Sequence, residues 1–289
     1  MTADPPGQSN LFPAEDRAGG GGPVAPDLQR LPTGSIRVGT SGFSFRDWIG
    51  PFYPPGTPPG GMLDFYQRRF RTVELNATYY RIPSTEAMRR MAERSVPDFN
   101  FMVKLPAALT HERRDIASPA AAILDAVAPL GSAGRLAGLL AQFPYSFRRT
   151  GAAEQYLADL RRALPGRAVF AEFRHASWDA PDLPELLARV DCGFCAVDEP
   201  DLPGLMPRRA FVAGDTAYVR LHGRNRRDWW GGGSRRYDYR YDEAELGEWA
   251  RIVRELAQEA RRTYVFFNNC HAGHAVVNAR MFAELLSGG

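Results

Sequence analysis

Short apolar runs alternate with segments of helical periodicity from Ile36 to the end of the chain, and this alternation limits the possible folds more than any other feature. It is typical of parallel strands that are joined by crossover helices. Eight runs have the length and composition of strands: Ile36–Gly42, Thr72–Tyr79, Asn100–Leu105, Leu136–Phe143, Ala168–Arg174, Gly193–Asp198, Ala217–Leu221 and Tyr264–Asn268. Eight such repeats in about 250 residues predict a single α/β domain, a (β/α)8 barrel of the TIM type.

An open, doubly wound sheet is the alternative, because periodicity alone does not show that a sheet closes. A dinucleotide-binding sheet would carry GxGxxG after its first strand. The segment in that place, GTSGFSF at Gly39–Phe45, has too few glycines at the wrong spacing. The sequence therefore favours the closed barrel.

The helices between the strands begin at recognisable signals. Ser84 is placed to cap one helix, and Pro119 follows Ser118 at the start of another. Asp242 and Glu245 form a capping box before an apolar stripe.

Residues 1–34 differ from the rest, because they are rich in glycine and proline and include four consecutive glycines at 19–22. We expect a disordered tail there, followed by the barrel domain over residues 35–289. The tail lacks the pattern of a secretion signal, and no apolar run reaches the roughly 18 residues that span a bilayer. The three cysteines suit a reducing compartment, so we expect a cytoplasmic protein without a membrane segment. The CxxC pair Cys192 and Cys195 leads into an apolar run and is interpreted as strand packing.

Polar residues gather where the predicted strands end, which in a (β/α) barrel is the end that carries the chemistry. Isolated charges inside apolar strands are costly, so these side chains must meet partners near the barrel axis. The candidate catalytic residues are Glu172, His175, His222 and Asp198. The candidate substrate-binding residues are Glu74, Asn76, Tyr80, Lys104, Gln142, Arg174, Arg220, Arg224, Asn268 and Asn269.

The cationic side chains in this set outweigh the carboxylates and predict an anionic ligand. Barrels often hold phosphate between the loops after the seventh and eighth strands, here Leu221–Arg224 and Asn268–Ala275, where Gly273 precedes the last helix. His175 and His222 titrate near neutral pH, so we expect Glu172 with one of these histidines to transfer protons. A structural ion-pair network that fills the barrel is the competing interpretation.

Two further interpretations remain open. The mixture of carboxylates and histidines would suit a metal-dependent hydrolase or isomerase, although the cationic excess and the absence of metal-binding motifs argue against a divalent ion, and no cofactor is predicted. The segment from Arg224 to Asp242 interleaves arginines with tryptophan and tyrosine around three glycines. It could act as a lid over the mouth or as the surface of a non-catalytic nucleic-acid-binding module.

Several longer motifs occur in a fixed order along the chain. They are GTSGFSFRDWIGPFYP at Gly39–Pro54, ELNATYYRIP at Glu74–Pro83, VKLPAALTH at Val103–His111, LAQFPYSF at Leu140–Phe147, EFRHASW at Glu172–Trp178, the turn Asp198–Pro200, YVRLHGR at Tyr218–Arg224, YDYRY at Tyr237–Tyr241, FFNN and HAVVNA. This order resembles the YecE-like family, a bacterial and archaeal domain of unknown function, over residues 35–288. Phe43 and Phe45 stand where the family more usually has Trp and Tyr. The resemblance implies a TIM barrel and implies no established reaction.

The sequence thus predicts an enzyme that acts on a phosphorylated or otherwise anionic substrate, such as a nucleotide or nucleic acid, by acid/base chemistry at the carboxyl-terminal mouth of the barrel.

Overall fold

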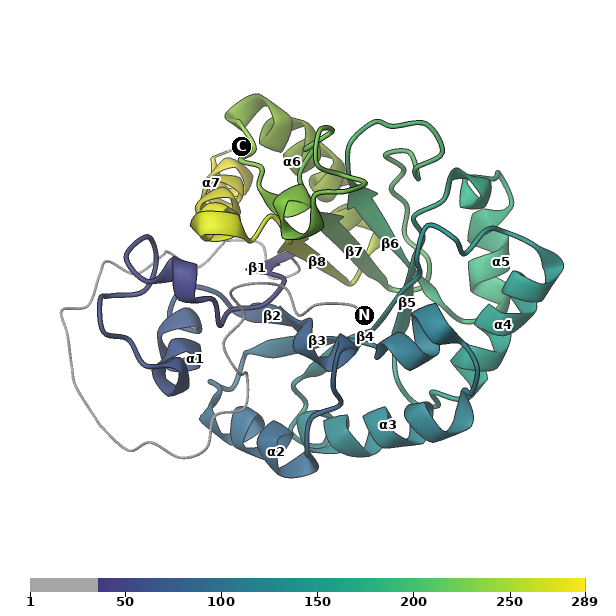
Figure 1. Cartoon of the computed structure of the whole chain (residues 1–289), viewed down its shortest axis with the longest axis horizontal. Helices are drawn as coiled ribbons and strands as arrows, with labels where there is room; N and C mark the ends of the chain where they lie inside the picture. The colour runs from purple at the N-terminus through teal and green to yellow at the C-terminus, as the bar shows by residue number, and fades with distance from the viewer. Residues whose placement is uncertain (1–35, 289) are drawn as a thin grey trace.

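The computed structural model describes residues 36–288, so the tail predicted for residues 1–34 lies outside the described residues. Figure 1 shows the strands gathered at the centre of the molecule with the helices around them. No helix in the described part of the chain is long and apolar enough to cross a membrane.

All eight predicted strands are present and form one parallel sheet in the order β1-β8-β7-β6-β5-β4-β3-β2. Their bounds are β1 Ile36–Thr40, β2 Thr72–Leu75, β3 Asn100–Lys104, β4 Leu136–Gln142, β5 Val169–Glu172, β6 Gly193–Asp198, β7 Thr216–Leu221 and β8 Arg262–Phe267. β1 and β2 meet at a single parallel bridge between Ser41 and Glu74, where the Gly42 amide donates to the Glu74 carbonyl at 2.8 Å. The sheet is therefore a nearly closed barrel, as predicted.

The second strand ends at Leu75, four residues earlier than predicted. Ala77–Tyr79 form a 3₁₀ turn instead, and the hydroxyl of Thr78 donates to the carbonyls of Leu75 and Lys104. Because this side chain occupies backbone acceptors, the chain turns away from the sheet. The turn brings Tyr79 to the carboxyl-terminal end of β3, where its ring meets the amine of Lys104.

In residues 36–288 seven α-helices cover the barrel: α1 Met62–Tyr66, α2 Thr85–Arg94, α3 Ala117–Ser132, α4 Gly151–Arg162, α5 Leu183–Arg189, α6 Glu243–Glu259 and α7 His274–Ser287. The predicted cap at Ser84 accepts a hydrogen bond from the Ala87 amide, and the capping box of Asp242 and Glu245 is present. Residues 199–215, which join β6 to β7 and are all described, contain no helix. One of the eight expected crossover helices is thus replaced by a loop.

Apolar side chains pack on both sides of the strands. The larger cluster lies between the sheet and the helices. A smaller cluster fills the inside of the barrel below its carboxyl-terminal mouth and consists of Met102, Leu140, Phe170, Cys195, Tyr218, Tyr264 and Phe266. Cys192 and Cys195 are buried free thiols, in agreement with a packing role. Since side chains alternate along a strand, the residues two positions beyond this inner cluster also face the barrel axis.

Candidate functional site

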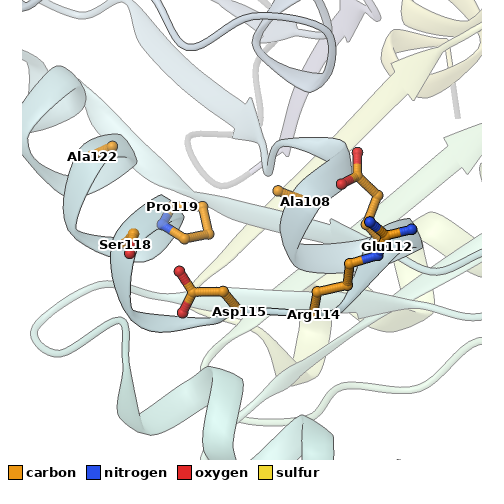
Figure 2. A pocket seen from close by; sticks show the side chains of 7 residues that line it. All are labelled: Ala108, Glu112, Arg114, Asp115, Ser118, Pro119 and Ala122. Carbon is orange, nitrogen blue, oxygen red and sulfur yellow. The ribbon is translucent and has the colours of Figure 1, made fainter.

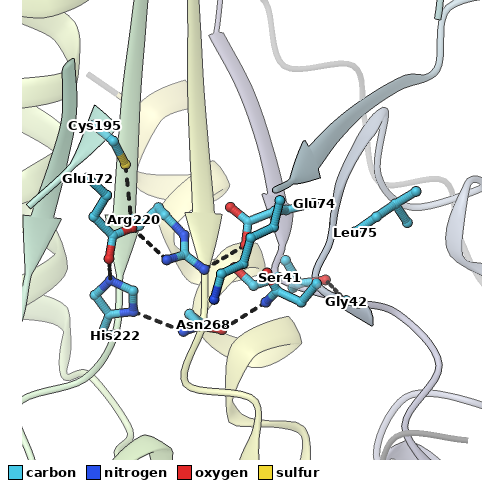
Figure 3. Close-up of polar contacts among 12 residues, drawn as sticks. Ser41, Gly42, Glu74, Leu75, Glu172, Cys195, Arg220, His222 and Asn268 are labelled. Carbon is cyan, nitrogen blue, oxygen red and sulfur yellow. Dashed lines mark hydrogen bonds and ion pairs between the residues drawn. The ribbon is translucent and has the colours of Figure 1, made fainter. Parts of the chain in front are cut away.

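A buried charged layer lies directly above the inner apolar cluster. Figure 3 shows Arg220 between the carboxylates of Glu74 and Glu172. The Arg220 guanidinium donates to Glu74 Oε1 and to Glu172 Oε2 at 2.6 Å each, and Tyr218 donates its hydroxyl to the other oxygen of Glu74. The three charged side chains are at most 1% exposed. Pairing offsets the cost of removing each of these charges from water.

Arg174 extends these contacts towards the mouth. Its Nε lies 2.7 Å from Glu172 Oε1, and its Nη1 donates to Glu199 Oε2 at 2.7 Å. We define the ion-pair network as Glu74, Glu172, Arg174, Glu199 and Arg220. The Arg174 side chain is 11% exposed, more than that of any other member. Arg174 is therefore the guanidinium of the network that a ligand in the mouth reaches most easily.

His222 joins the network to a pair of amides. Its Nε2 lies 3.3 Å from Glu172 Oε1 and 3.1 Å from Arg174 Nη2, and its Nδ1 lies 2.9 Å from Asn268 Nδ2. Asn76 in turn donates to Asn268 at 3.5 Å. These contacts fix the imidazole ring from both sides.

The protonation states of the histidine and the central carboxylate follow from these contacts. Burial alone would raise the pKa of Glu172, but Arg220 and Arg174 outweigh it and hold the pKa well below its usual value. Burial and the charge of Arg174 lower the pKa of His222 to about 3. Glu172 is thus a carboxylate and His222 a neutral ring at neutral pH, an arrangement that anchors other groups better than it exchanges protons.

Lys104 is the basic residue in the mouth that has no carboxylate partner. Within the described residues no carboxylate oxygen lies within 4.0 Å of its amine, which sits 4.3 Å from the centroid of the Tyr79 ring. The side chain is partly exposed, yet burial and the charge of Arg220 lower its pKa to about 7, against the opposing effect of Glu172 and Glu74. Its amine therefore exists in both protonation states at physiological pH.

The amino-acid composition singles out Lys104, although no sequence motif does. The chain has 36 basic residues, and Lys104 is the only lysine among them. Arginine stays charged in proteins, whereas a buried lysine readily loses its proton. Of the 36 lysine and arginine side chains, the one that can be neutral near pH 7 thus stands in the barrel mouth.

Glu199 belongs to the network, although the sequence pattern pointed to its neighbour Asp198 as the candidate site residue. It is 4% exposed, and burial raises its pKa to about 7, against the opposing effect of Arg174. Within the described residues its Oε1 has no hydrogen-bond partner. Strand alternation was the available signal, because Glu199 lies four residues after Cys195 and shares its inward face.

The structure separates Asp198 and Arg224 from the other candidates. Asp198 accepts from Arg224 Nε at 3.0 Å, and Arg224 Nη1 donates to Glu245 of α6 at 2.9 Å. Burial raises the pKa of Asp198, while Arg224 opposes the rise. This pair connects the end of β6 to α6, so it stabilises the loop after β7 and lies outside the ion-pair network.

Four more sequence candidates lie around the mouth without joining the network. His175 accepts from the Ser177 amide at 3.0 Å and packs on Tyr145, and Tyr80 is 45% exposed on the rim. Gln142 donates to the neighbouring Phe143 carbonyl at 2.8 Å. Asn269 donates to the Tyr239 carbonyl and to Asn278, which ties the loop after β7 to α7.

The segment from Arg224 to Asp242 packs on the barrel in this structure. Trp229 is 3% exposed, with the guanidinium of Arg174 5.6 Å from its ring centroid. The Gly223 amide donates to the Tyr241 hydroxyl at 2.8 Å, and residues Gly233–Tyr237 form a 3₁₀ turn. The segment therefore forms one wall of the mouth.

The start of α7, where the sequence suggested a phosphate, is covered by the loop after β1. Asp47 accepts the Ala272 amide at 2.7 Å, Trp48 donates to the Cys270 carbonyl at 2.8 Å, and Pro51 lies against Gly273. A carboxylate of the chain thus already uses an amide that an anion would need. The cations available to a ligand lie instead at Lys104, Arg174 and the rim.

Neither a metal site nor the detected outer pocket coincides with the network. Among residues 36–288 no three His, Cys, Asp or Glu side chains are grouped so that they could hold a metal ion. The carboxylates of the network contact guanidinium groups. A pocket of about 400 Å³ lies between Ala108–Glu112 and the start of α3 (Figure 2). No member of the network lines this pocket.

Comparison with known proteins places the chain in a family. The model of the family described as a protein of unknown function, DUF72, matches residues 37–289, so the chain belongs to this family. The UPF0759 protein YunF of Bacillus subtilis is 30% identical over 270 residues, which cover 87% of this chain and 94% of YunF. The UPF0759 protein YecE of Escherichia coli is 40% identical over 50 residues, or 17% of this chain and 18% of YecE.

Two solved structures share the fold. A DUF72 family protein from Thermotoga maritima is 42% identical and superposes with a TM-score of 0.82 over 87% of this chain and 99% of its own. A DUF72 family protein from Enterococcus faecalis is 25% identical, with a TM-score of 0.79 over 88% of this chain and 96% of its own. These likenesses confirm the YecE-like resemblance and the barrel. The names of these relatives state no reaction, so the chemistry is argued from the side chains.

Proposed function

We propose that this member of the DUF72 family is an enzyme that acts on a phosphorylated or otherwise anionic substrate, and that the amine of Lys104 transfers protons in the mouth of the barrel. The observation that carries the proposal is the position of the only lysine in the chain. It stands in the mouth without a carboxylate partner in the described part of the molecule, and its pKa is about 7.

A purely electrostatic role would not require lysine at this position. The chain uses arginine for every other cation, and arginine binds phosphate and carboxylate well. Lysine differs because it can lose its proton, and a group with a pKa near the working pH is the most effective general acid or base. As an ammonium, Lys104 attracts an anionic substrate, and as an amine it accepts a proton from it.

The surrounding residues fit supporting roles. Arg174 is partly exposed and is available to an anionic group of the substrate. Glu172 and Arg220 give Arg174 and Lys104 a fixed electrostatic environment. Asn268 and Asn76 offer amide groups for neutral polar atoms. Glu199 is the member of the network that is able to exchange a proton, because its pKa is about 7 and its Oε1 has no hydrogen-bond partner among the described residues.

This assignment moves the proton-transfer role from residues favoured by the sequence pattern. Glu172 is held as an anion and His222 as a neutral ring, so both fit a positioning role. Burial and Arg148 lower the pKa of His175, and its Nδ1 is occupied by the Ser177 amide. Asp198 is engaged by Arg224 away from the mouth.

The test compares Lys104→Arg with the unaltered protein. Turnover of phosphorylated metabolites, nucleotides and oligonucleotides is followed by mass spectrometry, and binding by the shift in thermal unfolding. Lys104→Arg keeps the cation but cannot release a proton. We expect it to retain ligand-induced stabilisation and to lose turnover by about 100-fold or more. Turnover at the original rate in Lys104→Arg would refute the role of the amine.

Two controls separate the alternatives. Arg251→Gln, at an exposed position on α6, should change neither reading. Ligand binding without turnover of any compound would favour the non-catalytic nucleic-acid-binding module. Turnover that a chelator abolishes would favour the metal-dependent hydrolase or isomerase, for which the mouth carboxylates would first have to leave their arginine partners.

A further inference from the structure

Large apolar side chains are exposed at one end of the molecule. In the described part of the chain they are Ile49, Tyr80 and Trp230, with 37%, 45% and 55% of their surface exposed. Each lies on a loop that follows the carboxyl end of a strand, so all three belong to the side of the mouth. An exposed tryptophan is uncommon on a surface that only faces water, and it often marks a binding site.

Trp230 is the exposed end of a row of three rings. Its ring centroid lies 4.8 Å from that of Tyr145, and the Tyr145 centroid lies 4.8 Å from that of His175. His175 is the chain neighbour of Arg174, which belongs to the ion-pair network. The three rings come from the loops after β7, β4 and β5, so the fold places them side by side.

The loop that carries Trp230 is held firmly. The adjacent Trp229 is buried, and the guanidinium groups of Arg174 and Arg236 lie 5.6 and 6.0 Å from its ring centroid. Asn225 donates to the Arg235 carbonyl at 2.9 Å across the turn. A ring on such a support loses little freedom when a ligand stacks on it.

Three exposed arginines of the Arg224–Asp242 segment have no carboxylate partner among the described residues. Arg226, Arg227 and Arg240 are exposed, and in the described residues no carboxylate lies within 4.0 Å of them. The three aspartates of the segment are already engaged: Asp228 with Arg235 at 3.7 Å, Asp238 with His274 at 3.4 Å, and Asp242 with the Glu245 amide at 2.9 Å. The rim therefore presents positive charge beside an exposed aromatic ring.

We propose that this rim binds single-stranded nucleic acid, with a base stacked on Trp230 and the phosphates contacted by the arginines of the Arg224–Asp242 segment. Stacking needs unpaired bases, and exposed aromatics with interleaved arginines are the combination that single-stranded nucleic acids recognise. Tyr145 and His175 extend this ring surface from Trp230 to the chain neighbour of Arg174. The inference rests on the proposed function in one respect: it names single-stranded nucleic acid as the class of substrate. Binding of the strand is measured separately from turnover.

An anionic membrane is the competing partner of this charge pattern. Membrane-bound segments present several apolar side chains on one face. The exposed apolar side chains at this end stand singly on three different loops, and within the fully described Arg224–Asp242 segment only Trp230 is exposed. The surface therefore fits a stacked base better than a lipid interior.

The experiment measures fluorescence anisotropy of a labelled single strand of about 12 nucleotides, a length within the usual site size, and of the matching duplex. Titrations at about 50 and 200 mM salt give the salt dependence. Trp230→Ala should weaken binding roughly 5- to 150-fold, as expected for one lost stack, without changing the salt slope. Ile49→Ala, which removes an exposed apolar side chain from another loop, is the matched control and should bind as the unaltered protein does.

The salt dependence of binding tests whether arginines of the rim contact the phosphates. Changing Arg226 and Arg227 together to glutamine should reduce the slope of log affinity against log salt by about 1.4, because each single-strand phosphate contact contributes about 0.7. Arg251→Gln serves as the control. Equal binding by Trp230→Ala and the unaltered protein would overturn the proposal, as would a preference for the duplex or for vesicles of anionic phospholipid.

Lys104→Arg distinguishes this inference from the proposed function. If it binds the strand normally but no turnover is found in any variant, the binding surface stands and the enzyme proposal fails. If turnover of small anions depends on Lys104 while no strand binds, the rim proposal alone fails.

Discussion

Arg220 Nη2 lies 2.6 Å from Glu74 Oε1, although 146 positions separate the two residues and both side chains are almost completely buried. The contact joins β7 to β2 across the barrel axis. A second contact of the same length joins Arg220 to Glu172 of β5. One guanidinium therefore holds three strands of the barrel in a fixed relation.

Arg220→Met should consequently be strongly destabilising. It leaves Glu74 and Glu172 buried without this partner, and breaking a buried pair on one side costs about 3–5 kcal/mol. Chemical denaturation measures the change in the free energy of unfolding. Arg251→Met, on the exposed face of α6, is the control and should stay within about 0.5 kcal/mol of the original. A loss below about 1 kcal/mol for Arg220→Met would show that the pair contributes little to the fold.

Glu199 should give the protein a pH-dependent stability. Burial raises its folded-state pKa to about 7, above the roughly 4.3 of an unfolded glutamic acid. The folded state therefore binds more protons between these values, and this contribution to the free energy of unfolding is present below about pH 4.3 and is lost as pH rises to about 7. Glu199→Gln removes the titrating group, so the variant should gain stability relative to the original between pH 5 and pH 8. The exposed Glu259→Gln should show no such trend, and a pH-independent difference for Glu199→Gln would contradict the raised pKa.

The wall formed by the loop after β7 depends on Gly223. Its φ is +90°, and an added Cβ would lie 2.6 Å from Cβ of Tyr239. We expect Gly223→Ala to cost roughly 1–3 kcal/mol and to loosen the loop, because the backbone conformation and the contact are both unfavourable for alanine. Gly231→Ala on the same loop meets no atom within 4 Å and should leave stability nearly unchanged. Thermal unfolding and protease cleavage within the loop report the two effects, and equal behaviour of the two variants would contradict this account of the wall.

Most of the fold could be predicted from the sequence because each strand is a short apolar run that is buried on both faces. The missing helix between β6 and β7 was not predicted, because the eight repeats were inferred from the strands alone. The three prolines and two glycines of residues 199–215 are the signal that argues against a helix there. Strand ends were less certain for a local reason. Thr78, for example, satisfies the Leu75 carbonyl with its side chain and ends β2 early.

The sequence predicts where in the barrel the candidate site lies. It predicts less well which side chains contact one another there. The strand-end rule placed Glu74, Glu172, Arg174 and Arg220 at one end of the barrel, where they do meet. It did not distinguish Asp198 from Glu199, because that distinction requires extending the inward and outward alternation of β6 one residue past the end of the strand. It also treated the cations as an excess, whereas Arg174, Arg220 and Arg224 are each paired with carboxylates. The special position of Lys104 depends on a comparison across the whole composition rather than on any motif.

The most direct test of the account is the titration of Lys104 itself. Reductive methylation with ¹³C-formaldehyde labels only this amine and the α-amino group, because the chain has no other lysine. The NMR shift of the methyl carbons then follows the protonation of Lys104, with the α-amino signal as an internal reference. Burial and the charge of Arg220 predict a pKa of about 7, and an anion such as inorganic phosphate bound in the mouth should raise it. A pKa near 10.4, the value of an exposed lysine, would contradict the proposal that Lys104 exchanges protons at physiological pH.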